Sequence, residues 1–335
     1  MRTPAAALHP PGAVVTFLAS FMRLSFSLLI SATLPLAADP VTPPLPTGGV
    51  ELPAKKELPP PVTVETVPLV PSPVVPGLMS PSGTEATIFA DNARHQVASP
   101  AALCIDEQGR VLVAEALRLK SGVEDNRNHR YWLLDDIAST SVDDRRAMHE
   151  KWDEKVPVAS LSKKTERVRM LEDADQDGTA DHSTVFAENF NDLLDGTAGG
   201  IFSFQGTVYF ACIPHIWALQ DTDNDNVAEF RHSLHDGFGV RVSLSGHDLN
   251  GFALGPDGRL YGTIGDRGMN LTTDEGLKLA YTNQGAAFRF DPDGSNFEVI
   301  HAGLRNPKEI AFDKWGNAVS VDNNSDQGDK ARLVY

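Results

Sequence analysis

The stretch Ser245–Gly268 has the sequence SGHDLNGFALGPDGRLYGTIGDRG, which predicts a β-hairpin. Its apolar segments Phe252–Leu254 and Leu260–Ile264 flank a Gly-Pro-Asp-Gly turn. Because an antiparallel hairpin brings its two ends together, we expect His247 and Asp266 to lie side by side. An Asp beside a His fixes the tautomer of the ring and stabilises its protonated form, as a general base requires. A pair of solvated loop residues is the alternative.

This hairpin belongs to a repeating pattern. Four turns containing glycine each lead into an apolar strand, and the last two intervals between these glycines are 52 and 58 residues. A second unit, in which two strands flank an Asp-rich turn, recurs in the same segments. This spacing predicts an all-β fold, a β-propeller, in preference to a sandwich. The turn glycines are Gly109, Gly206, Gly258 and Gly316, and the paired strands are Val168–Leu171 with Ser183–Phe186, Ile216–Leu219 with Ala228–Arg231, and Ala287–Phe290 with Phe297–Ile300.

The pattern amounts to about three blades and the beginning of a fourth. Since a propeller needs at least about four blades to close, we expect the chain to be the N-terminal part of a longer protein. The propeller is expected over residues 84–335. It contains an insertion near residues 117–164 with one helix, Ser141–Trp152, whose first turn is acidic.

The N-terminus resembles an export signal. Arg23 precedes the apolar run Leu24–Leu36, and small residues follow it. We therefore expect a signal peptide over residues 1–38, a periplasmic or secreted protein, and no membrane span in the mature chain. Residues 39–83 are rich in proline and are expected to form a disordered linker. The formal charge of −16 argues against nucleic acid as a partner.

Two acidic loops have the alternating carboxylates of a calcium-binding turn. The first contains Asp173, Asp175, Asp177 and Asp181, with a glycine at residue 178 for the sharp turn. The second contains Asp221, Asp223 and Asp225, with Asn226 in place of the glycine. Both lack the remainder of an EF-hand, so acidic turns that cap their own backbone are the alternative. Any ions bound here would be structural.

A second polar cluster flanks the last predicted hairpin. Arg305 and Asn306 precede the strand Glu309–Phe312, and Asp322–Asp326 follow the strand Ala318–Val321. We expect this cluster at the same edge as His247, where arginine suits an anionic ligand and the Asn/Asp run offers oxygen ligands for a hard cation. An Arg–Asp salt bridge that holds a loop is the alternative.

These motifs resemble the soluble quinoprotein glucose/sorbosone dehydrogenases. The resemblance rests on His247, the Gly-Pro-Asp-Gly turn, the Thr-Ile-Gly-Asp segment that ends at Asp266, and Gly303–Pro307, and it covers about residues 200–335. The earlier part, with Ala114–Arg118 and the acidic loops, is similar to the secreted "membrane-bound dehydrogenase" proteins of planctomycete-type bacteria.

The resemblance implies a six-bladed propeller that binds pyrroloquinoline quinone (PQQ) at one end of its channel. His247 would take a proton from a sugar or alcohol substrate, Asp266 would orient His247, and a cytochrome could accept the electrons. Arg305 and Asn306 would contact the quinone, and Ca²⁺ would polarise it through oxygens near Asn323 and Asn324. We also expect a cofactor contact at Asn270. A non-catalytic, calcium-stabilised propeller that binds carbohydrate or a protein is the alternative.

Overall fold

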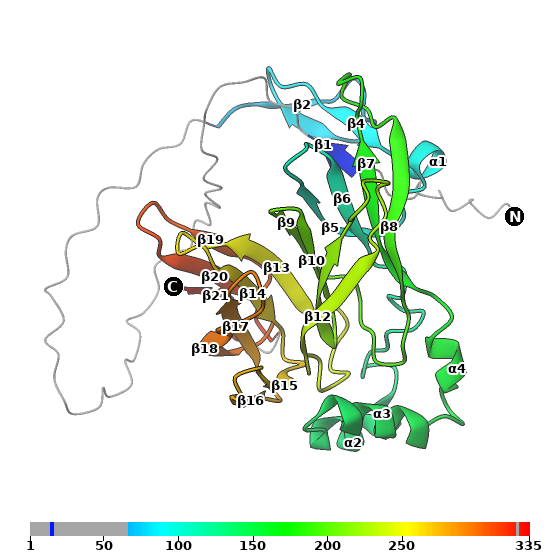
Figure 1. The fold of residues 1–335 in the computed structure, drawn as a ribbon, viewed down its shortest axis with the longest axis vertical. Coiled ribbons are helices and arrows are strands. Elements are labelled where there is room, and N and C mark those ends of the chain that lie inside the picture. Colours follow the sequence, from blue (N-terminus) through cyan, green and yellow to red (C-terminus); the bar gives the residue numbers. More distant parts are fainter. Residues whose placement is uncertain (1–13, 17–65, 326–327) are drawn as a thin grey trace, which may run out of the picture. The chain divides into compact units, whose positions relative to one another are not determined.

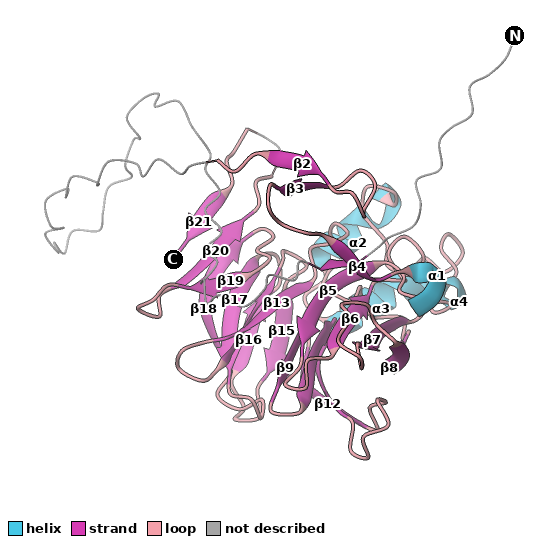
Figure 2. Cartoon of the chain, turned by 90° about the horizontal axis from the view of Figure 1, so that it is seen from above, coloured by secondary structure: helices cyan, strands magenta, loops and turns pink. Residues whose placement is uncertain are grey.

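The computed structural model describes residues 14–16, 66–325 and 328–335. The chain divides into two units, which are Met1–Thr16 with Ile88–Tyr335, and Phe17–Thr87. The larger unit is all-β apart from four short α-helices and one 3₁₀ helix among its described residues (Figures 1 and 2). No helix in the described ranges has the length and hydropathy needed to cross a bilayer.

The larger unit is built as a succession of propeller blades, as the sequence predicts. Three blades are four-stranded antiparallel sheets, and a three-stranded sheet forms the fourth. The first strands of neighbouring blades contact one another, as expected around a propeller axis. The blades are β5 (Pro100–Ile105), β6 (Val111–Glu115), β7 (Glu166–Glu172) and β8 (His182–Phe190); β9 (Gly200–Phe204), β10 (Thr207–Cys212), β11 (His215–Gln220) and β12 (Phe230–Asp236); β13 (Leu249–Leu254), β14 (Leu260–Ile264), β17 (Gly285–Phe290) and β18 (Glu298–Leu304); and β19 (Ile310–Phe312), β20 (Ala318–Asp322) and β21 (Arg332–Val334).

The four predicted glycine turns join the first and second strands of the four blades. Their glycines have φ between 77° and 86°, in the left-handed region that side chains disfavour. Added Cβ atoms would meet nothing within 4 Å at three of the four, so backbone conformation and not space selects glycine there. The recurring glycine is therefore a reliable marker of the blade.

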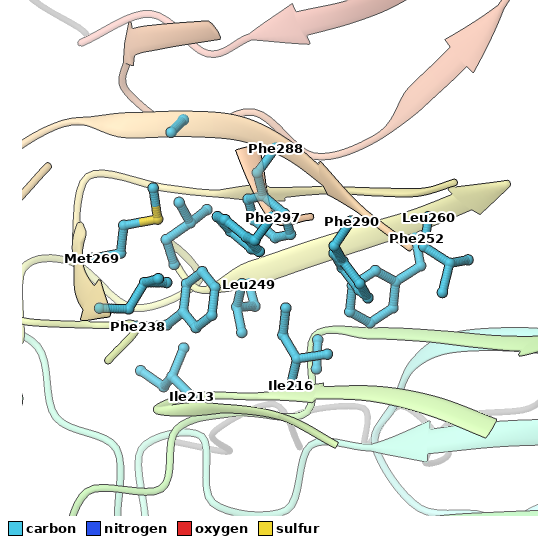
Figure 3. Packing of buried hydrophobic residues seen from close by; sticks show 14 of the residues in the cluster. Ile213, Ile216, Phe238, Leu249, Phe252, Leu260, Met269, Phe288, Phe290 and Phe297 are labelled. Atoms are coloured by element: carbon cyan, nitrogen blue, oxygen red, sulfur yellow. The ribbon is translucent and has the colours of Figure 1, made fainter. Parts of the chain in front are cut away.

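Apolar side chains that alternate along the strands form cores between adjacent blades. The core between the second and third blades includes Phe238, Phe288, Phe290 and Phe297 (Figure 3). Phe288 and Phe297 stack with ring centroids 5.0 Å apart and planes inclined by 24°. Another core joins the first and second blades around Phe190 and Phe210. Burial of these rings holds neighbouring sheets face to face.

Two insertions separate the second and third strands of a blade. In the first blade the insertion contains the 3₁₀ helix η1 and the helices α2–α4. In the third blade it is the hairpin of β15 and β16, at the same end of the sheets as the helices (Figure 1). Ser141 caps the predicted helix in a capping box with Asp144. The bounds are η1 (Arg130–Trp132), α2 (Leu133–Ala138), α3 (Val142–Lys151), α4 (Val158–Leu161), β15 (Met269–Thr272) and β16 (Lys278–Tyr281).

The predicted disordered linker is wrong at its C-terminal end. In the smaller unit β2 (Leu69–Pro71) and β3 (Met79–Pro81) form an antiparallel hairpin. The Ser72 hydroxyl accepts hydrogen bonds from the N–H groups of Val74 and Val75, and these bonds stabilise the turn despite its prolines. Near the N-terminus of the larger unit, β1 (Val14–Thr16) pairs with β4 (Thr87–Ala90), and α1 (Asn92–His95) follows. The rest of the predicted signal peptide and linker lies outside the described residues.

Candidate active site

The predicted site residues occupy loops at one edge of the third and fourth blades. In an antiparallel blade, the loop entering the first strand and the loop leaving the second lie at the same edge. His247 precedes β13 and Asp266 follows β14, while Arg305 precedes β19 and Asp322 ends β20. Strand direction therefore brings the two predicted polar clusters to a common edge.

His247 and Asp266 form the expected pair. The Nδ1 atom of His247 lies 2.7 Å from Oδ1 of Asp266, and the hydroxyl of Ser243 donates to the same oxygen at 2.7 Å. Burial raises the pKa of Asp266, but the hydrogen bond and charge of His247, the Ser243 hydroxyl and the charge of Arg305 outweigh it, so the pKa lies below its usual range. Asp266 is thus an ionised acceptor at neutral pH.

An ionised acceptor at Nδ1 determines the tautomer of His247. Because the carboxylate of Asp266 can only accept, Nδ1 of His247 must carry hydrogen, and the neutral ring presents the lone pair of Nε2. Among the described residues, Nε2 has no hydrogen-bond partner, and His247 is 5% exposed. The arrangement can therefore accept a proton at Nε2 from a substrate.

Backbone contacts join this pair to the second cluster. The N–H of Asp266 donates to the carbonyl of Arg305 at 2.7 Å, and the N–H of Gly265 donates to the carbonyl of Asp248 at 3.2 Å. A Cβ atom at Gly265 would lie 2.6 Å from the carbonyl oxygen of His247. Glycine at this position allows the two ends of the hairpin to approach as closely as the pair requires.

Asp322 organises Arg305 and Asn306. Its buried carboxylate accepts hydrogen bonds from the backbone N–H groups of Arg305 and Asn306, at 2.9 and 2.8 Å, and also pairs with the side chain of Arg332. Among the described residues, the Arg305 side chain makes no salt bridge with Asp322, which binds the backbone of Arg305 instead, and Asp326 lies outside the described residues. This frees the Arg305 side chain for another partner.

Two polar atoms of this loop lack partners. Among the described residues, Nη1 of Arg305 and Oδ1 of Asn306 are buried and make no hydrogen bond. A buried polar group without a partner costs about 1–3 kcal/mol. One unpaired donor and one unpaired acceptor beside His247 and Asp266 indicate a place for a polar, anionic ligand.

The residues that directly follow His247 and Asp266 in the chain, Asp248 and Arg267, form a buried ion pair. Asp248 accepts from Nη1 of Arg267 at 2.6 Å and from the hydroxyl of Thr197 at 2.5 Å, and all three residues are buried. Sequence reasoning missed Arg267, Thr197 and Ser243 as parts of the site. Arg267 directly follows Asp266, a signal that was available, whereas Thr197 and Ser243 join the site only through the fold.

The remaining predicted ligands have different surroundings. The side chain of Asn270, in β15, donates to the carbonyl of Thr140 in the insertion at 2.7 Å, so this amide is used within the chain. Asn323 is exposed, and Asn324 is half-buried with its amide 3.5 Å from the carbonyl of Asp329. Their role as metal ligands stays a prediction.

The acidic loops join the third and fourth strands of the first and second blades, at the opposite edge from His247. Carboxylate oxygens of Asp173, Asp175 and Asp177 lie within 4.8 Å of one another, and those of Asp221, Asp223, Asp225 and Glu229 do the same. Asp181 lies outside the first group and accepts from the N–H groups of Ala174 and Asp175. Glu229, which was not among the predicted ligands, also belongs to the second group. Charge repulsion, chiefly from Asp225, raises the pKa of Asp223.

Comparison with known proteins gives one family match. The profile of a family described as "Domain of unknown function (DUF7133)" matches residues 77–333. No curated protein sequence matches the chain.

Solved structures similar to the chain have low identities and TM-scores. They include an oxidoreductase assigned as a glucose dehydrogenase from Thermus thermophilus (17% identity, TM-score 0.40, 71% of this chain and 62% of that one). A gluconolactonase from Xanthomonas campestris has 14% identity and a TM-score of 0.39, covering 73% of this chain and 61% of that one. The PQQ-bound aldose sugar dehydrogenase of Streptomyces coelicolor has 16% identity and a TM-score of 0.36, covering 70% and 60%. The chain thus spans under two thirds of each of these proteins.

Proposed function

The chain belongs to the family described as "Domain of unknown function (DUF7133)", and we propose that it acts in a PQQ-dependent dehydrogenase that oxidises a sugar or alcohol. The observation that carries this proposal is the His247–Asp266 pair, with Nε2 of His247 free, beside the unpartnered side-chain atoms of Arg305 and Asn306. Such a site combines a base with a binding place for an anion.

The residues fit a quinone that carries carboxylates. Nη1 of Arg305 would donate to an acidic oxygen, and Oδ1 of Asn306 would accept from a polar N–H of the ligand. Asn323 and Asn324 would offer amide oxygens to a Ca²⁺ ion beside it. When bound, the quinone supplies an acceptor for hydride.

The residues of the chain supply the proton chemistry. Nε2 of His247 would accept the proton of the substrate hydroxyl, while the carbon that bears this hydroxyl would lose its hydride to the quinone, so the alcohol would become a carbonyl compound. The ionised carboxylate of Asp266 stabilises the imidazolium that forms, and the Ser243 hydroxyl holds the carboxylate in place. Burial of His247 limits access of water to the proton.

Calcium in the acidic loops, export and the electron acceptor are further parts of the proposal. Each loop offers at least three carboxylates to a hard cation, at the edge away from His247, which suits a structural ion. The apolar run that follows Arg23 supports export to the periplasm or the medium, where a cytochrome could receive the electrons.

Titration with PQQ in the presence of Ca²⁺ tests the proposal. We expect the protein to bind PQQ and Arg305→Gln to bind it at least about tenfold more weakly, about 1.4 kcal/mol. Arg94→Gln is the matched control, because the Arg94 side chain is 60% exposed and its ion-pair partner in the described part of the chain is Asp91. Failure of the folded wild-type protein to bind PQQ would overturn the proposal and favour a propeller that binds carbohydrate or a protein. Equal affinity in Arg305→Gln would remove Arg305 from the site.

A further inference from the structure

We propose that the insertion of the first blade positions the His247–Asp266 pair, and that Asp136 in α2 is the positioning residue through which it acts. The inference rests on the proposed function, because it concerns the base of the proposed reaction. It assigns a role to a segment whose sequence pattern predicts none.

The link begins at Ser243. Its hydroxyl donates to the Asp266 oxygen that also accepts from His247, so the position of Ser243 determines how that carboxylate is oriented. Ser243 has φ = 49°, in the left-handed region. A non-glycine residue adopts this conformation only when its surroundings hold it there.

Asp136 and Asn126, both in the insertion, hold the backbone of Ser243 on both sides. The carboxylate of Asp136 accepts from the N–H of Val242 at 2.6 Å and from the N–H of Ser243 at 3.2 Å. The N–H of Asn126 donates to the carbonyl of Ser243 at 3.1 Å. The side chain of Asn126 also donates to Asp136, at 2.5 Å. Both polar groups of the Ser243 backbone are therefore bound by the insertion.

Further contacts attach the same loop. Asp125 accepts from the N–H and the hydroxyl of Ser245, at 2.9 and 3.0 Å. Val242 is buried in the apolar core of the insertion with Trp132 and Met148. Asp136 is 1% exposed, so its bonds form where water does not compete. The insertion thus fixes Val242, Ser243 and Ser245 in the loop that leads to His247.

The chemical consequence concerns the tautomer of His247. Without Asp136, Ser243 is free to leave its left-handed conformation, and Asp266 loses the hydroxyl that orients it. Nδ1 of His247 then has no fixed acceptor, and the hydrogen distributes between the two ring nitrogens. The base is correctly formed in only part of the molecules, so kcat falls while substrate affinity is retained.

The test is ¹⁵N NMR of the imidazole rings in protein labelled at histidine. The chain has ten histidines, so the resonance of His247 is identified by its absence in His247→Gln. Three variants are compared: Asp136→Asn, which places an amide opposite N–H donors; Ser243→Ala, which removes only the hydroxyl; and the control Asp135→Asn. Asp135 lies in the same helix but binds Lys151 and Trp152 within the insertion.

We expect one tautomer of His247, hydrogen on Nδ1, in the wild type and in Asp135→Asn, and a mixture in Asp136→Asn and Ser243→Ala. Ser243→Ala keeps the test valid if Asp136→Asn does not fold. In turnover we expect about a tenfold lower kcat in both, with KM unchanged. A single tautomer in Ser243→Ala and Asp136→Asn would overturn the inference. The NMR needs no cofactor, so absence of wild-type turnover would count against the proposed function alone.

Discussion

Asp266 contacts Nδ1 of His247 directly and so determines which nitrogen of the ring can act as the base. In Asp266→Asn the amide either donates to Nδ1, which places hydrogen on Nε2, or accepts with a weaker dipole than a carboxylate. We expect kcat to fall by about a hundredfold or more, with the affinity for PQQ nearly unchanged. Stopped-flow dye reduction and a quinone titration measure the two quantities. An unchanged kcat would show that His247 needs no orienting carboxylate.

Glu166 gives a second prediction at this scale, on stability. Burial raises its pKa to about 7, although its carboxylate accepts hydrogen bonds from the N–H groups of Leu117, Arg118 and Ala198. The pKa in the folded protein then exceeds the unfolded value near 4.5. The contribution of Glu166 to the free energy of unfolding is therefore complete below its pKa in the unfolded chain. This contribution is lost as the pH rises through the pKa of Glu166 in the folded protein.

Urea denaturation of the wild type and Glu166→Gln at several pH values checks this. The free energy of unfolding of the wild type minus that of Glu166→Gln should decrease as the pH rises from about 4.5 to 7. The other carboxyl groups titrate in both proteins, so their effects cancel in this difference. A difference that shifts in favour of the wild type as pH rises would mean that the three N–H donors outweigh burial.

At the scale of elements, the two acidic turns give a prediction about calcium. We expect Ca²⁺ to raise the Tm, since an ion that binds the folded form alone stabilises it. Asp223→Asn should reduce this increase, because Asp223 belongs to the group formed with Glu229. Asp293→Asn is the control: it lies in the corresponding turn of the third blade and binds Ser295. Equal increases in all three proteins would exclude the second loop as a calcium site.

Several turns, strands and helices of the fold follow from local features of the sequence. Glycines that need a left-handed φ, alternating strands and the Ser141 cap are local features, so the turns, the paired strands and α3 could be predicted. The β2–β3 hairpin was missed because its prolines suggest disorder, yet a serine side chain stabilises its turn. The short helices α2 and α4 have no strong pattern of their own, and tertiary contacts stabilise them.

For the candidate site, prediction succeeded where a hairpin connects the residues. His247 and Asp266 come together because one turn separates their strands. Ser243 and Asp136 could not be found, because their link to Asp266 crosses from the first blade to the loop before the third. Asp322 binds the backbone N–H group of Arg305 and not its side chain. This contact depends on the loop conformation, which the spacing of residues in the sequence does not determine.

At the scale of the whole molecule, stability depends on the cores between blades. Phe288 is fully buried, stacks on Phe297 and contacts Phe238, which joins the second and third blades. We expect Phe288→Ala to lower the free energy of unfolding by about 3–5 kcal/mol, because a cavity remains at a junction of two sheets. Trp315→Ala, at a side chain 75% exposed, should change it by less than about 0.5 kcal/mol. Urea denaturation compares them, and similar losses would contradict this account of the core.

The central claim is that this edge of the propeller holds a base and a quinone side by side. Replacement of His247 should abolish proton transfer and leave quinone binding intact, and so distinguishes the two functions. The most direct measurement is PQQ- and Ca²⁺-dependent dye reduction with a panel of aldoses and alcohols, on the wild type and His247→Gln, with quinone binding measured in parallel. The account predicts turnover in the wild type and at least about a hundredfold loss in His247→Gln, with quinone affinity retained. Undiminished turnover in His247→Gln would contradict it.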